Sequence, residues 1–398
     1  MDDGYQTRFQ GQGDHLLNRV DLARLITPEN YALEREQIFR RAWMPIAHTS
    51  DVPEKGSYFV YDVPTFNASL LVVRGRDDRI RVFHNACRHR ANRIVREGSG
   101  CSQALVCKFH GWAFTPEGDL AGITDESQFR NVDKSALGLV PVHSEVWESF
   151  IFVNFDSKPR YSLAEWLGPF HGQYSGYFDE HENVTSHRVE LNCNWHLGVN
   201  SFTEGYHTLY LHKSTARDYQ GGKANPNRRR PSMEIFERHH RYSAPGNPDH
   251  VEVPVEKLAI KYGRKILPAF DFDMTGLPPG VNPTRNEHWG FDVVEFFPNF
   301  VMLTGNCWHN EIWFWPIDAG RTLALNRGWT YKAKNPAQRA SRSYFRSRIR
   351  DVFREDLNTL EAQQGALASG AIKEIILSEQ EMALQHHYHV TERMMAAA

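Results

Sequence analysis

Residues 87–112 have the sequence CRHRANRIVREGSGCSQALVCKFHGW, and this stretch decides the fold of the first half of the chain. It contains two pairs of potential metal ligands: Cys87 and His89 with one residue between them, and Cys107 and His110 with two. Seventeen residues separate His89 from Cys107, which allows two short loops. Two such loops, each presenting one thiolate and one imidazole, can close on a single metal centre from two sides.

Short β-forming runs surround the two pairs and give this region its fold class. The runs are rich in Val, Ile, Tyr and Phe, and turn residues such as Pro64 separate them; they lie at 57–61, 69–74, 80–83, 104–106 and 150–155. Both pairs of ligands fall between these runs. We therefore expect an all-β domain over residues 44–157, with the metal centre inside it.

The mixed Cys/His pairs favour an iron–sulfur cluster over zinc. A Rieske-type [2Fe–2S] cluster takes two thiolates on one iron and two imidazoles on the other, and its potential of roughly −150 to +300 mV suits electrons from a reductase or ferredoxin. A Cys2His2 zinc site has the same ligands, but usually takes two cysteines from one hairpin and two histidines from a helix. Cys101, Cys193 and Cys307 lack partners at ligand spacing, so we expect them to be buried small side chains.

The same stretch resembles the Rieske domain of ring-hydroxylating oxygenase large (alpha) subunits. The resemblance implies that the cluster is held by all four residues of the two pairs, Cys87, His89, Cys107 and His110. The chain has Ala91 where that family often has Gly, and Lys108-Phe109 where it usually has Pro-Tyr. Because a Tyr hydroxyl there could donate to a cluster sulfur, Phe109 predicts a somewhat lower potential.

A second group of chemistry-bearing residues follows at 200–212, NSFTEGYHTLYLH. On a helix, Asn200, Glu204 and His207 would share one face. His212 would lie about 140° around the axis from His207, so both reach one metal only if the helix ends or kinks between them. Two histidines and one carboxylate form the facial triad of non-haem Fe(II) oxygenases, which leaves positions open for O2.

The third ligand and the roles of the polar neighbours come from the resemblance. Residues 352–364 (VFREDLNTLEAQQ) resemble the late helix of the same family, in which the Asp of an E-D-x4-E-x2-Q pattern binds iron. This assigns Asp356, with Glu355 as the alternative. In the family an acid at the position of Glu204, usually Asp, bridges a Rieske histidine of one subunit to an iron-binding histidine of its neighbour. Glu occurs in some branches, including ones that act on quaternary ammonium compounds.

Carried over to this chain, Glu204 would link His110 of one subunit to His207 of the next. That arrangement requires a head-to-tail ring, commonly a homotrimer. Asn200 is expected either to hydrogen-bond near the iron or to make a polar contact on the helix face.

The second half of the chain predicts an α+β domain over residues 158–398, with helices packed on an antiparallel sheet. We expect helices at about 162–180, 196–208, 336–367 and 378–394, and strands at about 288–318 and 321–331. Residues 215–250 show no regular pattern and are expected to form a long polar loop. Residues 1–43 are expected to form an N-terminal arm and a helix, starting at Thr27-Pro28, that packs on the catalytic domain.

Composition excludes several classes of partner. The net charge is −2, which gives no electrostatic footprint for nucleic acid. The sequence has neither a signal-peptide core near its beginning nor an apolar run of about 18 residues, so we expect a cytoplasmic protein with no membrane contact. Five irregularly spaced cysteines do not form a disulfide framework.

Together these features predict a terminal oxygenase component that activates O2 at a mononuclear Fe(II). Electrons from NAD(P)H would come through a separate flavin reductase, a ferredoxin or both, because the chain has no dinucleotide fingerprint. The expected reaction is mono- or cis-dihydroxylation of a small apolar aromatic or polycyclic substrate in aromatic hydrocarbon catabolism, by a homotrimer with or without a small β subunit. One alternative is N- or O-dealkylation, for example of a quaternary ammonium compound. Another is a simple electron carrier, which would need no second metal site.

Overall fold

The computed structural model describes residues 8–10, 18–216, 218–263 and 274–396, and the chain divides into two compact units. The β unit comprises residues Phe39–Trp166, a somewhat wider range than the expected 44–157. The α+β unit comprises residues Met1–Ile38 and Leu167–Ala398. Residues 1–7 and 11–17 of the expected N-terminal arm lie outside the described residues. No helix in the described ranges is long and apolar enough to cross a membrane.

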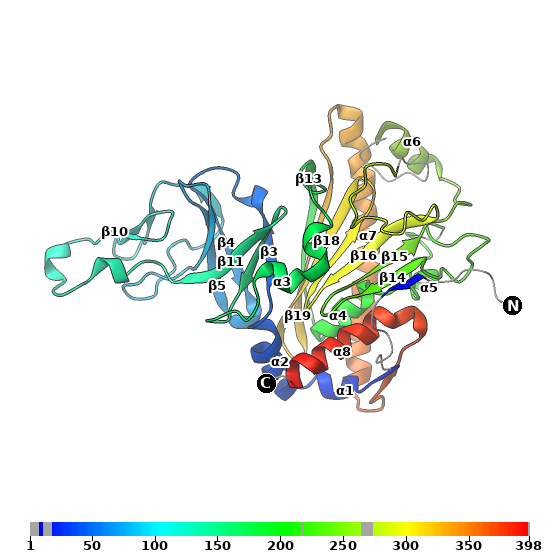
Figure 1. Cartoon of the computed structure of the whole chain (residues 1–398), viewed down its shortest axis with the longest axis horizontal. Helices are drawn as coiled ribbons and strands as arrows, with labels where there is room; N and C mark the ends of the chain where they lie inside the picture. Colours follow the sequence, from blue (N-terminus) through cyan, green and yellow to red (C-terminus); the bar gives the residue numbers. More distant parts are fainter. Residues whose placement is uncertain (1–7, 11–17, 217, 264–273, 397–398) are drawn as a thin grey trace. The chain divides into compact units, whose positions relative to one another are not determined.

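The β unit contains a seven-stranded antiparallel sheet in the order β3-β12-β11-β6-β5-β4-β7 and a three-stranded sheet in the order β10-β9-β8 (Figure 1). The strands are β3 (Met44–His48), β4 (Ser57–Val63), β5 (Ala68–Arg74), β6 (Ile80–His84), β7 (Ser99–Cys101), β8 (Leu105–Val106), β9 (Ala113–Phe114), β10 (Leu120–Gly122), β11 (Pro141–Trp147) and β12 (Phe150–Asn154). Short helical turns lie at Thr49–Asp51, Pro64–Phe66, Glu126–Gln128 and Lys134–Ala136, and α3 spans Leu163–Leu167.

The core of the β unit includes the two cysteines of the ligand pairs. Leu71, Val73 and Phe83, from the continuous apolar runs of β5 and β6, pack in one cluster with Cys87 and Cys107. Burial of both thiols follows from this packing. Cys193 and Cys307 are buried as expected, but Cys101 is exposed because it lies at the end of the edge strand β7.

The α+β unit is built on an eight-stranded sheet in the order β1-β14-β15-β16-β17-β18-β19-β13. Only β1 and β14 pair in parallel; the other neighbours in this sheet are antiparallel. Its strands are β1 (Arg8–Gln10), β13 (His181–Leu191), β14 (Ser232–Ile235), β15 (His240–Pro245), β16 (Trp289–Phe296), β17 (Phe300–Thr304), β18 (Trp308–Asp318) and β19 (Arg321–Tyr331). A small separate sheet pairs β2 (Arg19–Val20) with β20 (Ile375–Ile376).

This unit also contains helices, several of which pack on the sheet (Figure 1). They are α1 (Leu22–Leu25), α2 (Pro28–Glu34) continued by a π-helical turn (Arg35–Phe39), α4 (Trp195–Phe202), α5 (Thr208–Leu211), α6 (Pro254–Gly263), α7 (Pro336–Ala368) and α8 (Met382–Ala396), with 3-10 turns at Gly168–Gly172 and Glu379–Glu381. α4 contacts β17, β18, β19 and α7, and α6 packs on α7. The expected class, an all-β domain followed by helices on an antiparallel sheet, is confirmed.

Three expectations about single elements were wrong. The segment 215–250 is not one long loop, because it contains the paired strands β14 and β15. Their polar residues masked the strand pattern: Arg241 is buried and pairs with Glu234 at 2.5 Å. The helix expected at 162–180 is only α3 followed by a 3-10 turn, and the helix expected at 196–208 ends at Phe202.

Candidate metal centres

The two Cys/His loops of the β unit have the same backbone design. In the first, Cys87 N donates to Asn92 O at 2.8 Å and Ala91 N donates to Cys87 O at 2.9 Å. In the second, Cys107 N donates to Trp112 O at 2.8 Å and Gly111 N donates to Cys107 O at 2.9 Å. Each loop therefore closes on its own cysteine, and the three residues that follow each cysteine are exposed or partly exposed.

The fourth residue after each cysteine adopts a left-handed backbone conformation. Gly111 has φ of 74° and Ala91 has φ of 58°. Glycine adopts this conformation without steric cost, whereas alanine does not. This explains why a glycine suits the position of Ala91, where this chain departs from the resemblance.

The four predicted ligands of the cluster lie together. His89 Nδ1 is 3.1 Å from His110 Nδ1, and the two buried cysteines are hydrogen-bonding neighbours of each other. Burial raises the pKa of Cys87, whereas at Cys107 hydrogen bonds from the Phe109 backbone and from Asn92 outweigh burial and lower the pKa. A lowered thiol pKa favours metal binding, because the thiolate is the ligand.

The spread of these four ligands favours a two-iron cluster over a single zinc ion. In the described part of the chain, one set of three His, Cys, Asp or Glu ligand atoms lies within 4.8 Å of one another, and it is in the α+β unit. No three of the four cluster ligands in the β unit meet this limit. A [2Fe–2S] cluster needs that spread, since the thiolates and the imidazoles bind different irons.

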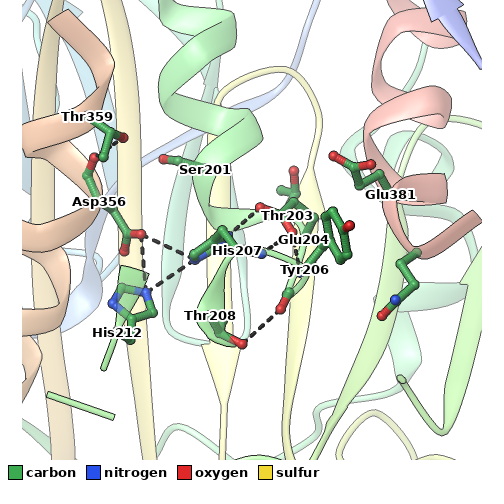
Figure 2. A network of polar contacts seen from close by, with 12 residues as sticks. Ser201, Thr203, Glu204, Tyr206, His207, Thr208, His212, Asp356, Thr359 and Glu381 are labelled. Carbon is green, nitrogen blue, oxygen red and sulfur yellow. Dashed lines mark hydrogen bonds and ion pairs between the residues drawn. The ribbon is translucent and has the colours of Figure 1, made fainter. Parts of the chain in front are cut away.

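The set in the α+β unit is His207, His212 and Asp356. His207 Nε2 lies 3.2 Å from His212 Nε2, and Asp356 Oδ1 lies 3.3 Å from each of these nitrogens (Figure 2). Three ligand atoms at these separations can bind one metal ion at bond lengths of roughly 2.0–2.3 Å, on one face of a tetrahedron or of an octahedron. Asp356 Oδ1 is buried without a conventional hydrogen bond, which fits an atom whose partner is a metal ion.

Helix breaks position the two histidines. α4 ends at Phe202, before Glu204, so Asn200, Glu204 and His207 do not share one helix face and that expectation was wrong. His207 and His212 instead flank the four-residue helix α5, one at each end. α5 ends at Leu211, so the expected helix end does lie between the two histidines, and both imidazoles reach the same point. Asp356 comes from the middle of α7.

Each histidine is oriented by a second carboxylate on its outer nitrogen. Glu204 accepts a hydrogen bond from His207 Nδ1 (Figure 2), and Glu355 Oε2 lies 2.8 Å from His212 Nδ1. Such outer carboxylates fix the imidazole tautomer and ring plane of metal ligands. Glu355, the alternative third ligand, thus faces the far side of His212, and the geometry favours Asp356.

The electrostatics of the triad suit a cation. Burial opposes a positive charge on His207, but the carboxylates of Asp356 and Glu204 outweigh it and raise the pKa of His207 to about 10. The same balance raises the pKa of His212, where Asp356 is the main opposing group. The carboxylates therefore favour positive charge at this point, as a divalent metal requires.

Of the two roles expected for Asn200, the structure shows the polar contact on the helix face, with a partner that the sequence did not indicate. Its Nδ2 donates to the hydroxyl of Tyr388 on α8, and both groups are partly or fully buried. Because the two residues are 188 positions apart, their contact could not be predicted from the sequence. This hydrogen bond ties α4 to α8.

A cavity of about 240 Å³ opens on the triad within the α+β unit. Phe202 from α4 and strand residues such as Phe291, Val293 and Leu303 line it. Helices α6 and α7 also contribute, with Glu256 and Arg348 among their lining residues, which sequence reasoning missed.

Two family models match the chain. One, described as Ring hydroxylating alpha subunit (catalytic domain), covers residues 178–397, and the other, described as Rieske [2Fe-2S] domain, covers residues 42–138. The chain belongs to the ring-hydroxylating alpha subunit family. Membership confirms the suspected resemblance and the expected [2Fe–2S] domain, and it agrees with a mononuclear iron site in the catalytic α+β unit.

Curated relatives include enzymes with different names. Choline monooxygenase of Beta vulgaris is 32% identical over 48% of this chain and 44% of its own length, and benzene 1,2-dioxygenase subunit alpha of Pseudomonas putida is 31% identical over 49% and 44%. The chain thus spans less than half the length of these relatives. The carnitine monooxygenase oxygenase subunit of Acinetobacter baumannii is 23% identical over 89% of this chain and 87% of its own length.

Solved structures share the fold of the whole chain. A quaternary ammonium Rieske monooxygenase superposes with a TM-score of 0.75 at 20% identity, covering 94% of each chain. Naphthalene 1,2-dioxygenase from Rhodococcus sp. superposes with a TM-score of 0.74 at 18% identity, covering 95% of this chain and 94% of the other. These similarities establish the architecture.

Proposed function

We propose that this chain is the terminal oxygenase component of a Rieske non-haem iron system. The observation that carries the proposal is the His207/His212/Asp356 triangle at the wall of a largely apolar cavity. Three ligands on one face leave the opposite face of a metal open to O2 beside a bound substrate. Monohydroxylation would convert one C–H bond, one O2, two electrons and two protons into an alcohol and water. cis-Dihydroxylation would use the same electrons and protons and retain both oxygen atoms.

The residues take separate roles in this proposal. Cys87, His89, Cys107 and His110 hold the cluster, and His207, His212 and Asp356 hold the iron. When bound, these groups supply single electrons and the reduction of O2, respectively. Glu355 keeps the outer nitrogen of His212 engaged, so that its Nε2 faces the metal position. The apolar wall keeps bulk water away from the reacting carbon.

Electrons would come from NAD(P)H through partner proteins. The sequence has no flavin or dinucleotide fingerprint, so a flavin reductase, with or without a ferredoxin, must deliver them to the β unit. The electron-carrier alternative predicts about two irons per chain, whereas the oxygenase predicts about three.

Glu204 would connect neighbouring subunits of a head-to-tail ring, most simply a homotrimer, with or without a small β subunit. Its carboxylate already holds His207 Nδ1, and a second hydrogen bond from His110 of the next chain would bring the two imidazoles within electron-transfer distance. Exposed aromatic side chains support a docking surface on each side: Tyr206 and Tyr210 near Glu204, and Phe109 next to His110.

The substrate would be a small apolar aromatic or polycyclic compound, consistent with aromatic hydrocarbon catabolism. The cavity supports this class because its lining includes Phe202, Phe291, Trp308 and Phe353. A second candidate is N- or O-dealkylation, for example of a quaternary ammonium compound. The match to a carnitine monooxygenase subunit over most of the chain and the acid Glu204 support it.

Oxygen uptake and product mass spectrometry with 18O2 test the proposal. The iron-loaded protein, supplied with a reductase, should incorporate 18O into a member of an aromatic, polycyclic and methylamine panel. Dealkylation would instead release formaldehyde from a methylamine. A fully reduced protein that holds about two irons per chain and consumes no O2 would contradict the oxygenase proposal.

A further inference from the structure

The catalytic cavity has a charged wall distant from the metal triad. Residues Arg348, Val352 and Asp356 follow one another at four-residue intervals on α7 and all line the cavity. Eight residues of helix separate Arg348 from Asp356, a rise of about 12 Å along the axis. One cavity therefore has a metal-binding end and, two helical turns away, an arginine.

The guanidinium of Arg348 is held in a defined orientation. It stacks on Tyr219, with Cζ 3.5 Å from the ring centroid. Nη2 donates to Thr215 O at 3.0 Å, and Nη1 donates to the Tyr344 hydroxyl at 3.3 Å. An arginine fixed in this way loses little side-chain entropy when it binds a ligand.

Glu256 satisfies only part of the hydrogen-bonding capacity of the Arg348 guanidinium. Its Oε1 accepts from Arg348 Nη1 at 3.4 Å, a long contact, while its Oε2 lies 3.0 Å from His250 Nε2 and also accepts from Val253 N. The Glu256 side chain is 2% exposed and the Arg348 side chain 21%, so the arginine is the charge that remains accessible. Burial lowers the pKa of Arg348 to about 10, which leaves it protonated at neutral pH.

We propose that Arg348 binds a carboxylate of the substrate, so that the substrate is an apolar body that ends in an acid group. A guanidinium recognises a carboxylate through two parallel hydrogen bonds. The helical rise of about 12 Å between Arg348 and Asp356 leaves room for an apolar body of one or two rings between the acid group and the metal position. That the substrate is oxidised at its end near the metal rests on the proposed function, whereas binding of its carboxylate by Arg348 does not.

Calorimetry on the iron-loaded protein without reductase tests the proposal. The probes are 2-naphthoate and the neutral 2-naphthamide. The native chain should bind naphthoate at least 10-fold more tightly than naphthamide. Arg348→Met should raise the Kd for naphthoate roughly 10- to 100-fold and change the Kd for naphthamide by no more than about twofold. The Kd of Arg348→Lys for naphthoate should lie between those of the native chain and Arg348→Met. Arg346→Met is the matched control, since Arg346 is an exposed arginine of the same helix that does not line the cavity.

The outcomes separate this inference from a structural role and from the proposed function. Equal losses for both probes, or no preference of the native chain for naphthoate, would overturn it. A third result would also overturn it: Glu256→Gln binds a 2-naphthyltrimethylammonium probe more weakly, and Arg348→Met binds naphthoate as the native chain does. This wall of the cavity would then recognise a cation. If Arg348→Met does not fold, the double variant with Glu256→Gln removes both charges and gives the same comparison. Calorimetry uses no electrons, so it gives a result even if the chain has no oxygenase activity. In a turnover assay with a reductase, Arg348→Met should raise KM for naphthoate and leave kcat nearly unchanged.

Discussion

The two candidate metal centres differ in how the chain assembles them. The cluster ligands lie within residues 87–110, on two loops that each close through hydrogen bonds to their own cysteine. The triad joins a short segment, residues 207–212, to Asp356 on a distant helix, so it exists only when α7 packs against α4. Local hydrogen bonds shape the first centre, and tertiary packing shapes the second. The two should therefore respond independently to substitution.

The largest expected effect comes from removing a cluster ligand. Cys107→Ser should eliminate the Rieske EPR signal and all turnover, because a hydroxyl does not replace the thiolate on iron. The mononuclear iron should remain, lowering iron from about three to about one per chain. Cys101→Ser is the control, since Cys101 is exposed and lies outside the cluster set. A persisting Rieske signal in Cys107→Ser would refute the ligand assignment.

The reciprocal substitution removes the long-range ligand. Asp356→Ala should lose the mononuclear iron and turnover but keep the EPR signal, with about two irons per chain. Asp351→Ala, on the same helix and paired with Arg350 at the surface, should retain all three irons. Unchanged iron content in Asp356→Ala would show that this carboxylate is not a ligand.

A smaller effect is expected where the two centres communicate. Glu204→Gln should leave both metals bound, because the amide can still contact His207, but it removes the charge proposed to link neighbouring subunits. Turnover should fall roughly 10- to 100-fold. Iron analysis and steady-state product formation check this together. Normal product formation would exclude the relay role.

The smallest effects concern the left-handed positions of the two loops. Ala91→Gly should stabilise the β unit by up to about 1 kcal/mol, since alanine is strained at φ of 58°. Gly111→Ala should destabilise it by at least about 1 kcal/mol, because the new Cβ would also lie 2.5 Å from Thr124 Oγ1. Thermal unfolding measures both changes. Shifts of the same sign would contradict the equivalence of the loops.

The same contrast explains what the sequence could predict. Cys87 and His89 share a loop, so spacing alone indicated a joint site. Asp356 required a family resemblance, because nothing in residues 200–212 specifies which late helix packs beside them. The break after Phe202 was missed because Glu204 and His207 have helical spacing, while the turn is held by the Glu204 carboxylate, which accepts from the backbone of Tyr206 and His207.

Buried polar residues account for the remaining differences. Arg241 and Glu234 made β14 and β15 look like a loop, although their charges are paired in the interior. The sequence did not single out Arg348 or Glu256, and only the packing of α6 on α7 brings them together at the cavity. Sequence patterns assume that charge lies outside, so they fail where charges pair inside the fold.

Iron and acid-labile sulfide per chain, measured on the purified native protein, test the central claim of two distinct centres most directly. The structure predicts about three irons and two sulfides, with a Rieske EPR signal after reduction. Two irons and two sulfides would leave the His207/His212/Asp356 triad without a metal and contradict the oxygenase proposal. One zinc and no sulfide in the β unit would contradict the cluster.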